Sequence, residues 1–330
     1  MKEKKLTMND IAKMAGVGKS TVSRYFNEGY VKEETRLKIK KIIDDFVYEP
    51  NALAKIMKAK KSNLIGIVVP TLDSKTSARM VMSLDEYLRH QKYTPIIINT
   101  NHNELRELNS IEQLWRMNVD GIILLATTLT MAHQNIASKL DIPFVILAQK
   151  LEHGISIVND DYHAGYEIGE YVAKKGHQKI AYLGVSSKDK AVGVIRKKGV
   201  SDGLNDYGIE HFDFIESDFS FEKARRKINQ YLKKNMPTII ICATDNLALA
   251  CYKEIQELGL KMPDDISLIS FGGYEVSSLI TPTLTTIRFE NEEAGCIAGQ
   301  TIINLINEKS VPPLQSVGYT LIEGKSVRNL

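Results

Sequence analysis

The sequence has few of the residues and runs that characterise several protein classes. Its three cysteines, Cys242, Cys251 and Cys296, lie far apart, which excludes a disulfide framework or thiolate metal site and favours a reducing cytoplasm. No apolar run reaches about 18 residues, so we expect no membrane-spanning helix. The polar start of the chain, MKEKKLTMND, predicts no signal peptide. With 43% hydrophobic and 25% charged residues among 330, the composition indicates a globular protein of two or three domains.

Motifs of common enzymes are also missing. There is no G-x-S-x-G elbow and no H-E-x-x-H pair, and the seven histidines are scattered. Gly18-Lys19-Ser20 resembles the end of a phosphate-binding loop, but Lys13 stands where that loop needs its first glycine. We therefore expect no catalytic residues, no metal and no cofactor.

Charge is distributed unevenly along the chain. Residues 1–61 carry fifteen Lys or Arg against eight Asp or Glu, whereas residues 62–330 have a net charge of −4. A small basic module on a mildly acidic body suggests that the module binds a polyanion. A sugar-transport protein would not need such a module and would carry a signal peptide.

The basic module predicts three short helices. Thr7 and Asp10 form a capping-box pattern, Gly16 ends the first helix, and a second helix begins near Lys19. A third helix is expected over residues 33–47. The apolar positions expected to face the common core are Ile11, Ala12, Ala15, Val22, Phe26, Ile39, Ile42, Ile43 and Phe46. Two short helices joined by a glycine-containing turn are typical of a helix-turn-helix.

From Leu64 onward, short apolar segments alternate with amphipathic ones. The expected strands are 64–69, 94–100, 120–127, 143–149, 156–160, 179–185, 238–245 and 266–273, and helices are expected at 104–118, 163–175, 222–234 and 246–258. Continuous apolar strands between helices predict parallel sheets covered on both faces. Ligands of such folds bind beyond the carboxyl ends of the strands.

Motifs along essentially the whole chain resemble those of the lactose-repressor (LacI) family of transcription factors. They are D-I-A-x-x-A-G-V at 10–17, T-V-S-R at 21–24 with Asn27, Y-x-P-N at 48–51, IGIVVP at 65–70, DGIIL at 120–124, D-x-x-x-x-G at 160–165, ATD at 243–245 and P-x-L-T-T-I at 282–287.

The resemblance implies an all-α helix-turn-helix headpiece (1–50), a hinge helix (51–61), and an α/β effector-binding and dimerisation domain (62–330) like the periplasmic sugar-binding proteins. Its two doubly wound parallel-sheet lobes would be 62–159 with 289–313, and 160–288 with 314–330.

The resemblance also implies how the headpiece contacts DNA. Lys19 and Ser20 would read base edges from the start of the recognition helix, and Met57 would wedge into the minor groove where relatives carry leucine. The complete set of expected contacts is Thr7, Gly18, Lys19, Ser20, Thr21, Arg24, Asn27, Asn51, Ala54 and Met57. A homodimer would place two such helices on a palindromic operator.

For the effector, the residues at matching positions are Thr71, Asp73, Ser74, Asp160, Arg196, Phe219, Asp245 and Phe289. Arg196 is the leading candidate because a guanidinium offers a rigid fork of donors. Asp160 and Asp245 could accept hydrogen bonds from sugar hydroxyls or serve as helix N-caps instead. The chain departs from the family where TLDSKTSA (71–78) lacks aromatics and where Phe271-Gly272-Gly273 replaces an F-D-D motif.

Other segments resemble the sucrose- and trehalose-operon repressor branch. They are L-D-S at 72–74, YLGV at 182–185 and CATDNLALA at 242–250. This implies a repressor of a carbohydrate operon, released by a disaccharide or phosphodisaccharide, most simply of the sucrose type. A repressor that responds to trehalose 6-phosphate and a co-repressor-dependent regulator of carbon catabolism stay open as alternatives.

Overall fold

The computed structural model describes residues 6–26, 29–46, 48 and 61–330. Contacts divide the chain into two compact units, Met1–Ser62 and Asn63–Leu330. Among the described residues, no helix is both long and apolar enough to cross a membrane.

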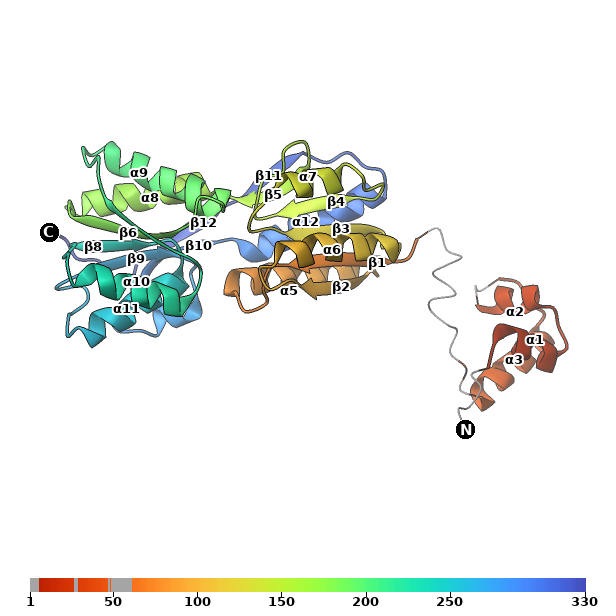
Figure 1. Ribbon diagram of the computed structural model, residues 1–330. Coiled ribbons are helices and arrows are strands. Elements are labelled where there is room, and N and C mark those ends of the chain that lie inside the picture. Colours follow the sequence, from red (N-terminus) through yellow and green to blue (C-terminus); the bar gives the residue numbers. More distant parts are fainter. Residues whose placement is uncertain (1–5, 27–28, 47, 49–60) are drawn as a thin grey trace. The chain divides into compact units, whose positions relative to one another are not determined.

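The first unit contains the three predicted helices, α1 (Met8–Ala15), α2 (Lys19–Phe26) and α3 (Glu33–Asp45) (Figure 1). Their core is built from Ile11, Ala12, Val22 and Ile39, as the apolar spacing predicted. The prediction for Phe46 was wrong: α3 ends at Asp45, and Phe46 is 53% exposed beyond that end.

The turn between α1 and α2 follows from its local sequence. Asp10 accepts a hydrogen bond from the Thr7 backbone N–H at 2.9 Å, and the Thr7 hydroxyl accepts one from the Asp10 N–H at 3.3 Å, which confirms the capping box. Gly16 has φ 66°, the left-handed conformation that ends many helices. The chain therefore turns directly from α1 into α2.

The second unit is built on two six-stranded sheets, one in each lobe (Figure 1). In the first lobe the strand order is β11-β5-β4-β3-β1-β2, and all neighbouring pairs are parallel. These strands are β1 (Leu64–Val69), β2 (Thr94–Asn99), β3 (Gly121–Leu125), β4 (Phe144–Leu147), β5 (Ile155–Asn159) and β11 (Leu314–Val317). The helices of this lobe are α5 (Lys75–His90), α6 (Glu104–Arg116), α7 (Met131–Ala137) and α12 (Asn291–Ile306).

The second lobe has the order β12-β10-β9-β8-β6-β7, in which the β10–β12 pair is antiparallel. Its strands are β6 (Ile180–Val185), β7 (Asp213–Ser217), β8 (Ile239–Cys242), β9 (Ser267–Phe271), β10 (Thr285–Phe289) and β12 (Tyr319–Ile322). Its helices are α8 (Asp161–Lys174), α9 (Lys197–Asn205), α10 (Phe221–Leu232) and α11 (Asp245–Glu257), with a π-helix η1 (Ala191–Arg196) and a 3-10 turn η2 (Glu275–Ser278). Figure 1 shows α8 and α9 on one face of this sheet and α10 and α11 on the other.

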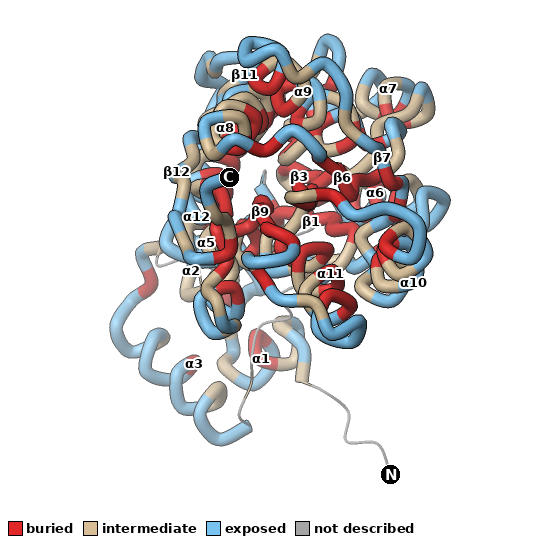
Figure 2. The backbone as a smooth tube through the Cα atoms, turned by 90° about the vertical axis from the view of Figure 1, so that its left-hand side faces the viewer, coloured by how far each residue is buried: buried red, intermediate tan, exposed pale blue. Residues whose placement is uncertain are grey.

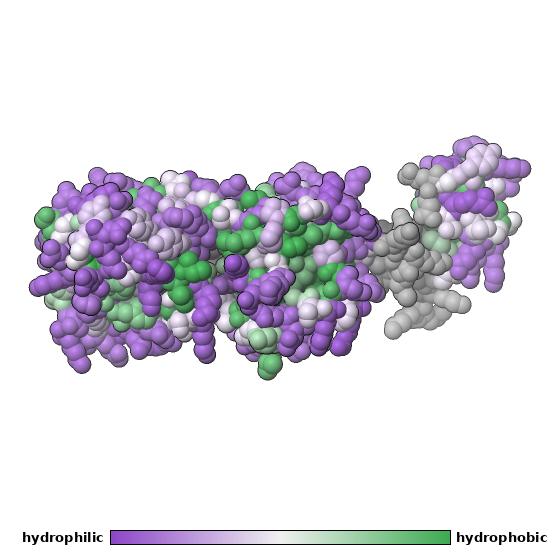
Figure 3. All heavy atoms as spheres, turned by 90° about the horizontal axis from the view of Figure 1, so that it is seen from above, coloured by the Kyte–Doolittle hydropathy of each residue, from purple (hydrophilic) through white to green (hydrophobic). Residues whose placement is uncertain are grey.

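Burial explains which strands the sequence predicted. Central strands such as β3, β8 and β9 are buried at every position because helices cover both faces (Figure 2). The eight predicted strands are present, whereas β7, β10, β11 and β12 were not predicted. β7, β11 and β12 are sheet edges with several exposed or half-buried positions, and β10 reads Thr-Thr-Ile-Arg-Phe, so none of the four is a continuous apolar run. Polar residues cover most of the face of this unit shown in Figure 3.

Three crossovers join the lobes, after β5, β10 and β11. The Asp160 N–H donates to the Val317 carbonyl and the Glu290 N–H donates to the Gly318 carbonyl, both at 3.1 Å, so the three segments lie side by side. The expected boundary at 313/314 is corrected by this arrangement. Because β11 pairs in parallel with β5 in the first sheet, the last crossover falls at Gly318.

Helices α8 and α9 pack unusually closely. A Cβ atom on Gly165 would lie 2.2 Å from the Arg196 carbonyl oxygen, and one on Gly199 would lie 2.1 Å from that of Tyr162. The glycines four residues later on each helix are equally crowded. Glycine at these positions therefore lets the two backbones touch directly.

Candidate functional site

The residues at the start of α2 are exposed on the surface of the first unit. Gly18, Lys19 and Ser20 are consecutive exposed residues, while Val22, one turn further, is fully buried in the core. Arg24 is also exposed, and Thr21 is half-buried. The core contact of Val22 thus holds α2 so that its first residues face outward, the orientation in which a recognition helix presents side chains to base edges.

The other predicted DNA contacts have different surroundings. Thr7 is exposed, but its hydroxyl donates to the Asp10 carboxylate at 2.5 Å in the cap of α1. Asn27, Asn51, Ala54 and Met57 lie outside the described residues, as does nearly all of the predicted hinge helix, 51–61.

Arg196, the last residue of the π-helix η1, lies at the centre of a buried polar cluster. Its Nε and Nη2 atoms donate to Asp161 Oδ1 at 2.8 and 2.6 Å, and Nη1 donates to the Ala243 carbonyl oxygen at 2.6 Å. The residue is only 5% exposed. A guanidinium has more N–H donors than these three bonds use, so Arg196 can still donate to a ligand.

Two aromatic rings hold the same guanidinium. Arg196 Cζ lies 4.8 Å from the Phe271 ring centroid and 4.9 Å from that of Phe289. The two rings stack with an interplanar angle of 13°. Phe289, predicted as an effector contact, is therefore a buried support of Arg196 at the end of β10.

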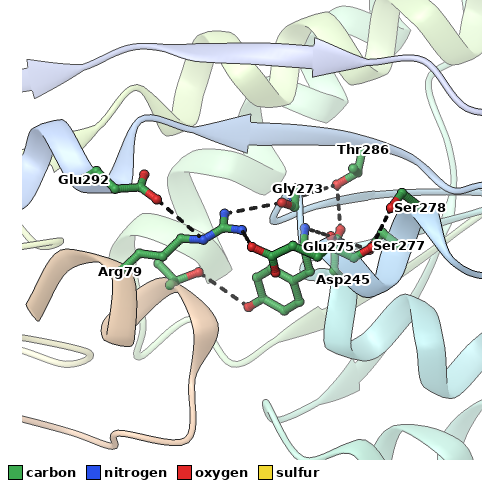
Figure 4. A network of polar contacts seen from close by, with 10 residues as sticks. Arg79, Asp245, Gly273, Glu275, Ser277, Ser278, Thr286 and Glu292 are labelled. Atoms are coloured by element: carbon green, nitrogen blue, oxygen red, sulfur yellow. Dashed lines mark hydrogen bonds and ion pairs between the residues drawn. The ribbon is translucent and has the colours of Figure 1, made fainter. Parts of the chain in front are cut away.

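Asp245 is fully buried and its carboxylate is saturated. Oδ1 accepts hydrogen bonds from Ser270 Oγ at 2.5 Å and Thr286 Oγ1 at 2.6 Å. Oδ2 accepts from Ser277 Oγ at 2.7 Å and from the Tyr274 N–H at 2.8 Å (Figure 4). Asp245 thus organises the loop after β9. The N-cap of α11 is Thr244, so the alternative in which Asp245 caps the helix was wrong by one residue.

Asp160 and Phe219 have structural partners as well. Asp160 is the N-cap of α8: its carboxylate accepts from the His163 N–H at 3.3 Å and pairs with the His163 ring at 2.8 Å. Phe219 is half-buried against the second-lobe core, and its carbonyl accepts from Asn246 Nδ2 at 2.9 Å. The N-cap alternative for Asp160 is therefore what the structure contains.

The loop before α5 carries the three predicted contacts of the first lobe. Thr71 Oγ1 accepts from the Asp73 N–H at 3.1 Å, and Ser74 caps α5 by accepting from the Ser77 N–H at 3.3 Å. Asp73 is exposed, whereas Thr71 and Ser74 are half-buried.

Tyr274, from the second lobe, reaches the first turn of α5, directly after this loop. Its hydroxyl lies 3.4 Å from Thr76 Oγ1. Burial raises the pKa of the Tyr274 phenol, while hydrogen bonding with Thr76 and Ser74 and the charge of Arg196 act in the opposite direction. Tyr274 therefore lies between the first-lobe loop and the Arg196 cluster.

An ion pair accompanies this contact between the lobes. Arg79 of α5 donates to Glu275 Oε1 at 2.5 Å and to the Gly273 carbonyl at 3.3 Å, and its Nε lies 3.6 Å from Glu292 (Figure 4). The loop that Asp245 organises is thus the segment of the second lobe that α5 contacts.

Three side chains near the crossovers and the Arg196 cluster have buried polar atoms without a hydrogen-bond partner in the described part of the chain. They are Asn159 (Oδ1), Asn291 (both amide atoms) and the Tyr182 hydroxyl. Asn159 ends β5 and Asn291 begins α12, one at each of two crossovers. Such groups are normally satisfied by water or a ligand.

Sequence reasoning missed Asp161, Tyr274 and Arg79. Asp161 stands next to Asp160, and only the direction of α8 shows which of the two carboxylates faces Arg196. Phe271 was noted only as part of a motif with missing aspartates. Tyr274 directly follows that departure, and an aromatic residue beyond the carboxyl end of a strand was the one available signal.

Comparisons with known proteins agree for both units. Residues 7–51 match the sequence profile described as bacterial regulatory proteins, lacI family. Residues 31–317 match the profile of periplasmic binding proteins and the sugar binding domain of the LacI family.

Among curated proteins, the sucrose operon repressor of Staphylococcus xylosus is 32% identical, covering 92% of this chain and 94% of its own length. The repressor PurR of Photobacterium profundum is 31% identical over 92% of this chain and 93% of its own. Catabolite control protein A of Priestia megaterium is 27% identical over 93% and 94%. A crystal structure of the Lac repressor dimer bound to operator and the anti-inducer ONPF superposes with a TM-score of 0.89, at 24% identity, over 98% of this chain and 100% of that one.

Proposed function

Because this chain belongs to the LacI family and is a DNA-binding transcriptional repressor rather than an enzyme, we propose that it controls a carbohydrate-utilisation operon. A disaccharide or phosphodisaccharide releases it from its operator in this proposal, and the proposed effector is sucrose or sucrose 6-phosphate. The observation that carries the proposal is the similarity to the sucrose operon repressor, at 32% identity over nearly the whole of both chains.

On the DNA side, the proposal assigns base reading to Lys19 and Ser20 and phosphate contacts to Thr21 and Arg24. The exposed start of α2 supports this assignment. Asn27, Asn51, Ala54 and Met57 complete the proposed interface by resemblance to the family.

On the sugar side, Arg196 is the proposed principal contact. Its fixed position against the rings of Phe271 and Phe289 and its spare donors support this role. Tyr274, Ser74 and Thr71 are proposed to line the same site from the loops on either side. Asp160, Phe219, Asp245 and Phe289 are proposed to support the site rather than to contact the sugar, because their partners lie within the protein. Asp73 is proposed to support the loop before α5, where its backbone N–H donates to Thr71 Oγ1.

A homodimer is part of the proposal. Met82 of α5 is 70% exposed and Leu279, directly after η2, is 78% exposed. Met82 follows Arg79 by three residues and Leu279 follows Glu275 by four, so both are near the Arg79–Glu275 ion pair. Exposed apolar residues gathered in this way are suited to a second copy of the chain. Sedimentation at micromolar concentration should give a dimer, and Met82→Asp should shift it toward the monomer.

The experiment that tests the function uses the full chain. Palindromic DNA is first enriched from a random pool, and sucrose, sucrose 6-phosphate, trehalose 6-phosphate and fructose phosphates are then screened for a thermal shift and for release of that DNA. We expect sucrose or its 6-phosphate to release it. Arg196→Lys keeps a positive charge beside Asp161 but loses the forked guanidinium, so it should weaken release by sugar and leave operator affinity unchanged. The control Arg226→Lys, on the exposed side of α10, should change neither release nor operator affinity.

Two outcomes would redirect the proposal. No enrichment of palindromic DNA would contradict dimeric operator binding. A ligand that tightens DNA binding would instead identify a co-repressor-dependent regulator of carbon catabolism, the alternative that the sequence left open.

A further inference from the structure

The lobes also meet at a second, buried contact, on the side of the π-helix. Gln149 follows β4 in the first lobe and is 5% exposed. Its Nε2 donates to Asp189 Oδ1 at 2.8 Å, and its Oε1 accepts from the Ala191 N–H at 3.3 Å. Asp189 belongs to the second lobe and is 6% exposed. A single first-lobe side chain therefore makes two hydrogen bonds with the second lobe.

Both bonds end at the first turn of η1. Asp189 Oδ1 also accepts from the Val192 N–H at 2.9 Å, so the N–H groups of Ala191 and Val192 are both satisfied by this pair. The first N–H groups of a helix have no partner within the helix and need such acceptors. One of these acceptors comes from the other lobe. The last residue of the same short helix is Arg196.

The amide suits this position better than other side chains of its size. Asp189 requires a donor and the Ala191 N–H requires an acceptor, and a glutamine amide provides both on adjacent atoms. A glutamate would place a second carboxylate against Asp189, and a methionine would provide neither bond. Single π-helical turns occur frequently at functional sites, which is consistent with a turn whose geometry must be held from outside.

We propose that Gln149 is a positioning residue, which fixes the π-helical turn that presents Arg196 and thereby links the arrangement of the lobes to the geometry of the effector contact. The link to the effector rests on the proposed function, whereas the link between Gln149 and η1 does not.

The first test needs no effector. Hydrogen exchange is measured in the full chain for peptides that cover Ala191–Arg196, with peptides of β3 and β4 as internal reference. Gln149→Met should speed exchange in the η1 peptides about tenfold, the effect of losing roughly one net hydrogen bond, and leave β3 and β4 unchanged. Unchanged exchange in η1 would overturn the proposal. Faster exchange throughout the first lobe would do so as well, because Gln149 would then only stabilise its own lobe.

A second variant provides a readout that general destabilisation would not reproduce. In Gln149→Glu the new carboxylate faces Asp189. Burial raises the pKa of Asp189, and of the charged groups nearby Arg196 lowers this pKa while Asp161 raises it. Protection of η1 should be lost at pH 8 and largely restored at pH 6, where the two carboxyls share a proton that acts as the missing donor. The control is Gln91→Glu, an exposed residue at the end of α5, for which the protection factors should match the parent at both pH values. Protection of η1 that does not depend on pH in Gln149→Glu would contradict the donor–acceptor role.

The third arm uses sucrose and sucrose 6-phosphate as probes. The sugar concentration that half-releases operator DNA should rise about tenfold in Gln149→Met, while operator affinity without sugar stays within twofold of the parent. A parallel loss of operator affinity would indicate a structural role and overturn the link to the effector. If neither sugar acts on the parent protein, the proposed function fails, and the exchange measurements still judge the positioning role of Gln149.

Discussion

The substitution Asp245→Asn distinguishes a structural carboxylate from a ligand-binding one. The Asp245 carboxylate accepts four hydrogen bonds, two at each oxygen, in a fully buried position. An asparagine can keep its oxygen toward Ser277 and the Tyr274 N–H. Its amide nitrogen must then face Ser270 and Thr286, whose hydroxyls have to turn from donating to accepting.

The expected cost follows from the loss of charge. Hydrogen bonds to charged groups contribute roughly 1.5–3 kcal/mol each, against about 1 kcal/mol for neutral ones. Weakening two to four such bonds while keeping them formed should lower the free energy of unfolding by about 3 kcal/mol. For a domain of this size, that corresponds to a fall in Tm of roughly 6–12 °C.

The assay is calorimetric unfolding of the full chain, with Asp73→Asn as the control. Asp73 is an exposed carboxylate in the first lobe, so the Tm of the Asp73→Asn variant should stay within about 1 °C of that of the parent, as for most surface substitutions. If Asp245→Asn kept the parental Tm but no longer responded to sugar, Asp245 would be a direct effector ligand and the reasoning above would be refuted.

Three further predictions concern other parts of the molecule. Lys19→Ala should change which operator bases are tolerated, whereas Arg24→Ala should weaken binding uniformly; selection of randomised operators by each variant compares the two, and a uniform loss for Lys19→Ala would make it a phosphate contact. Gly199→Ala should lower the free energy of unfolding by about 2 kcal/mol, measured by urea unfolding, because the added Cβ would lie 2.1 Å from the Tyr162 carbonyl oxygen; an unchanged midpoint would mean that α8 and α9 separate freely. Burial lowers the pKa of His177 below 6.5, so on acidification the unfolded chain binds this proton before the folded chain does. Tm should therefore fall as the pH drops below 6.5 toward the pKa of the folded state, and His177→Gln should flatten this dependence. Equal slopes of Tm against pH in the variant and the parent would rule out His177 as the source.

The sequence predicted the fold wherever local pattern and burial coincide. The three headpiece helices were predicted because their apolar residues recur at the spacing of a buried face, and eight strands were predicted because each contains a short apolar run. The edge strands β7, β11 and β12 were not, because their exposed positions leave them without the continuous apolar run that made the edge strand β2 predictable.

For the candidate site, several of the predicted residues cluster in the structure, but their partners differ from those that were predicted. Arg196, the leading candidate for the effector contact, lies at the centre of the buried polar cluster. Asp245 and Phe289 are also present there, but as partners of the protein itself. Whether a carboxylate at the end of a strand faces inward to hydroxyl donors or outward to a ligand depends on residues far away in sequence, such as Thr286 for Asp245. Local pattern holds no information on that pairing.

The close contact of α8 and α9 has a mechanical consequence. With glycine on both helices, the two backbones have no side-chain layer between them, so we expect them to move as one rigid piece. The leading end of that piece is Asp160, on a crossover between the lobes, and Arg196 directly precedes α9. We therefore expect a rotation of the chain at the crossover to move α8, α9 and the Arg196 guanidinium together, and a displacement of Arg196 to be transmitted through the same two helices to the junction of the lobes.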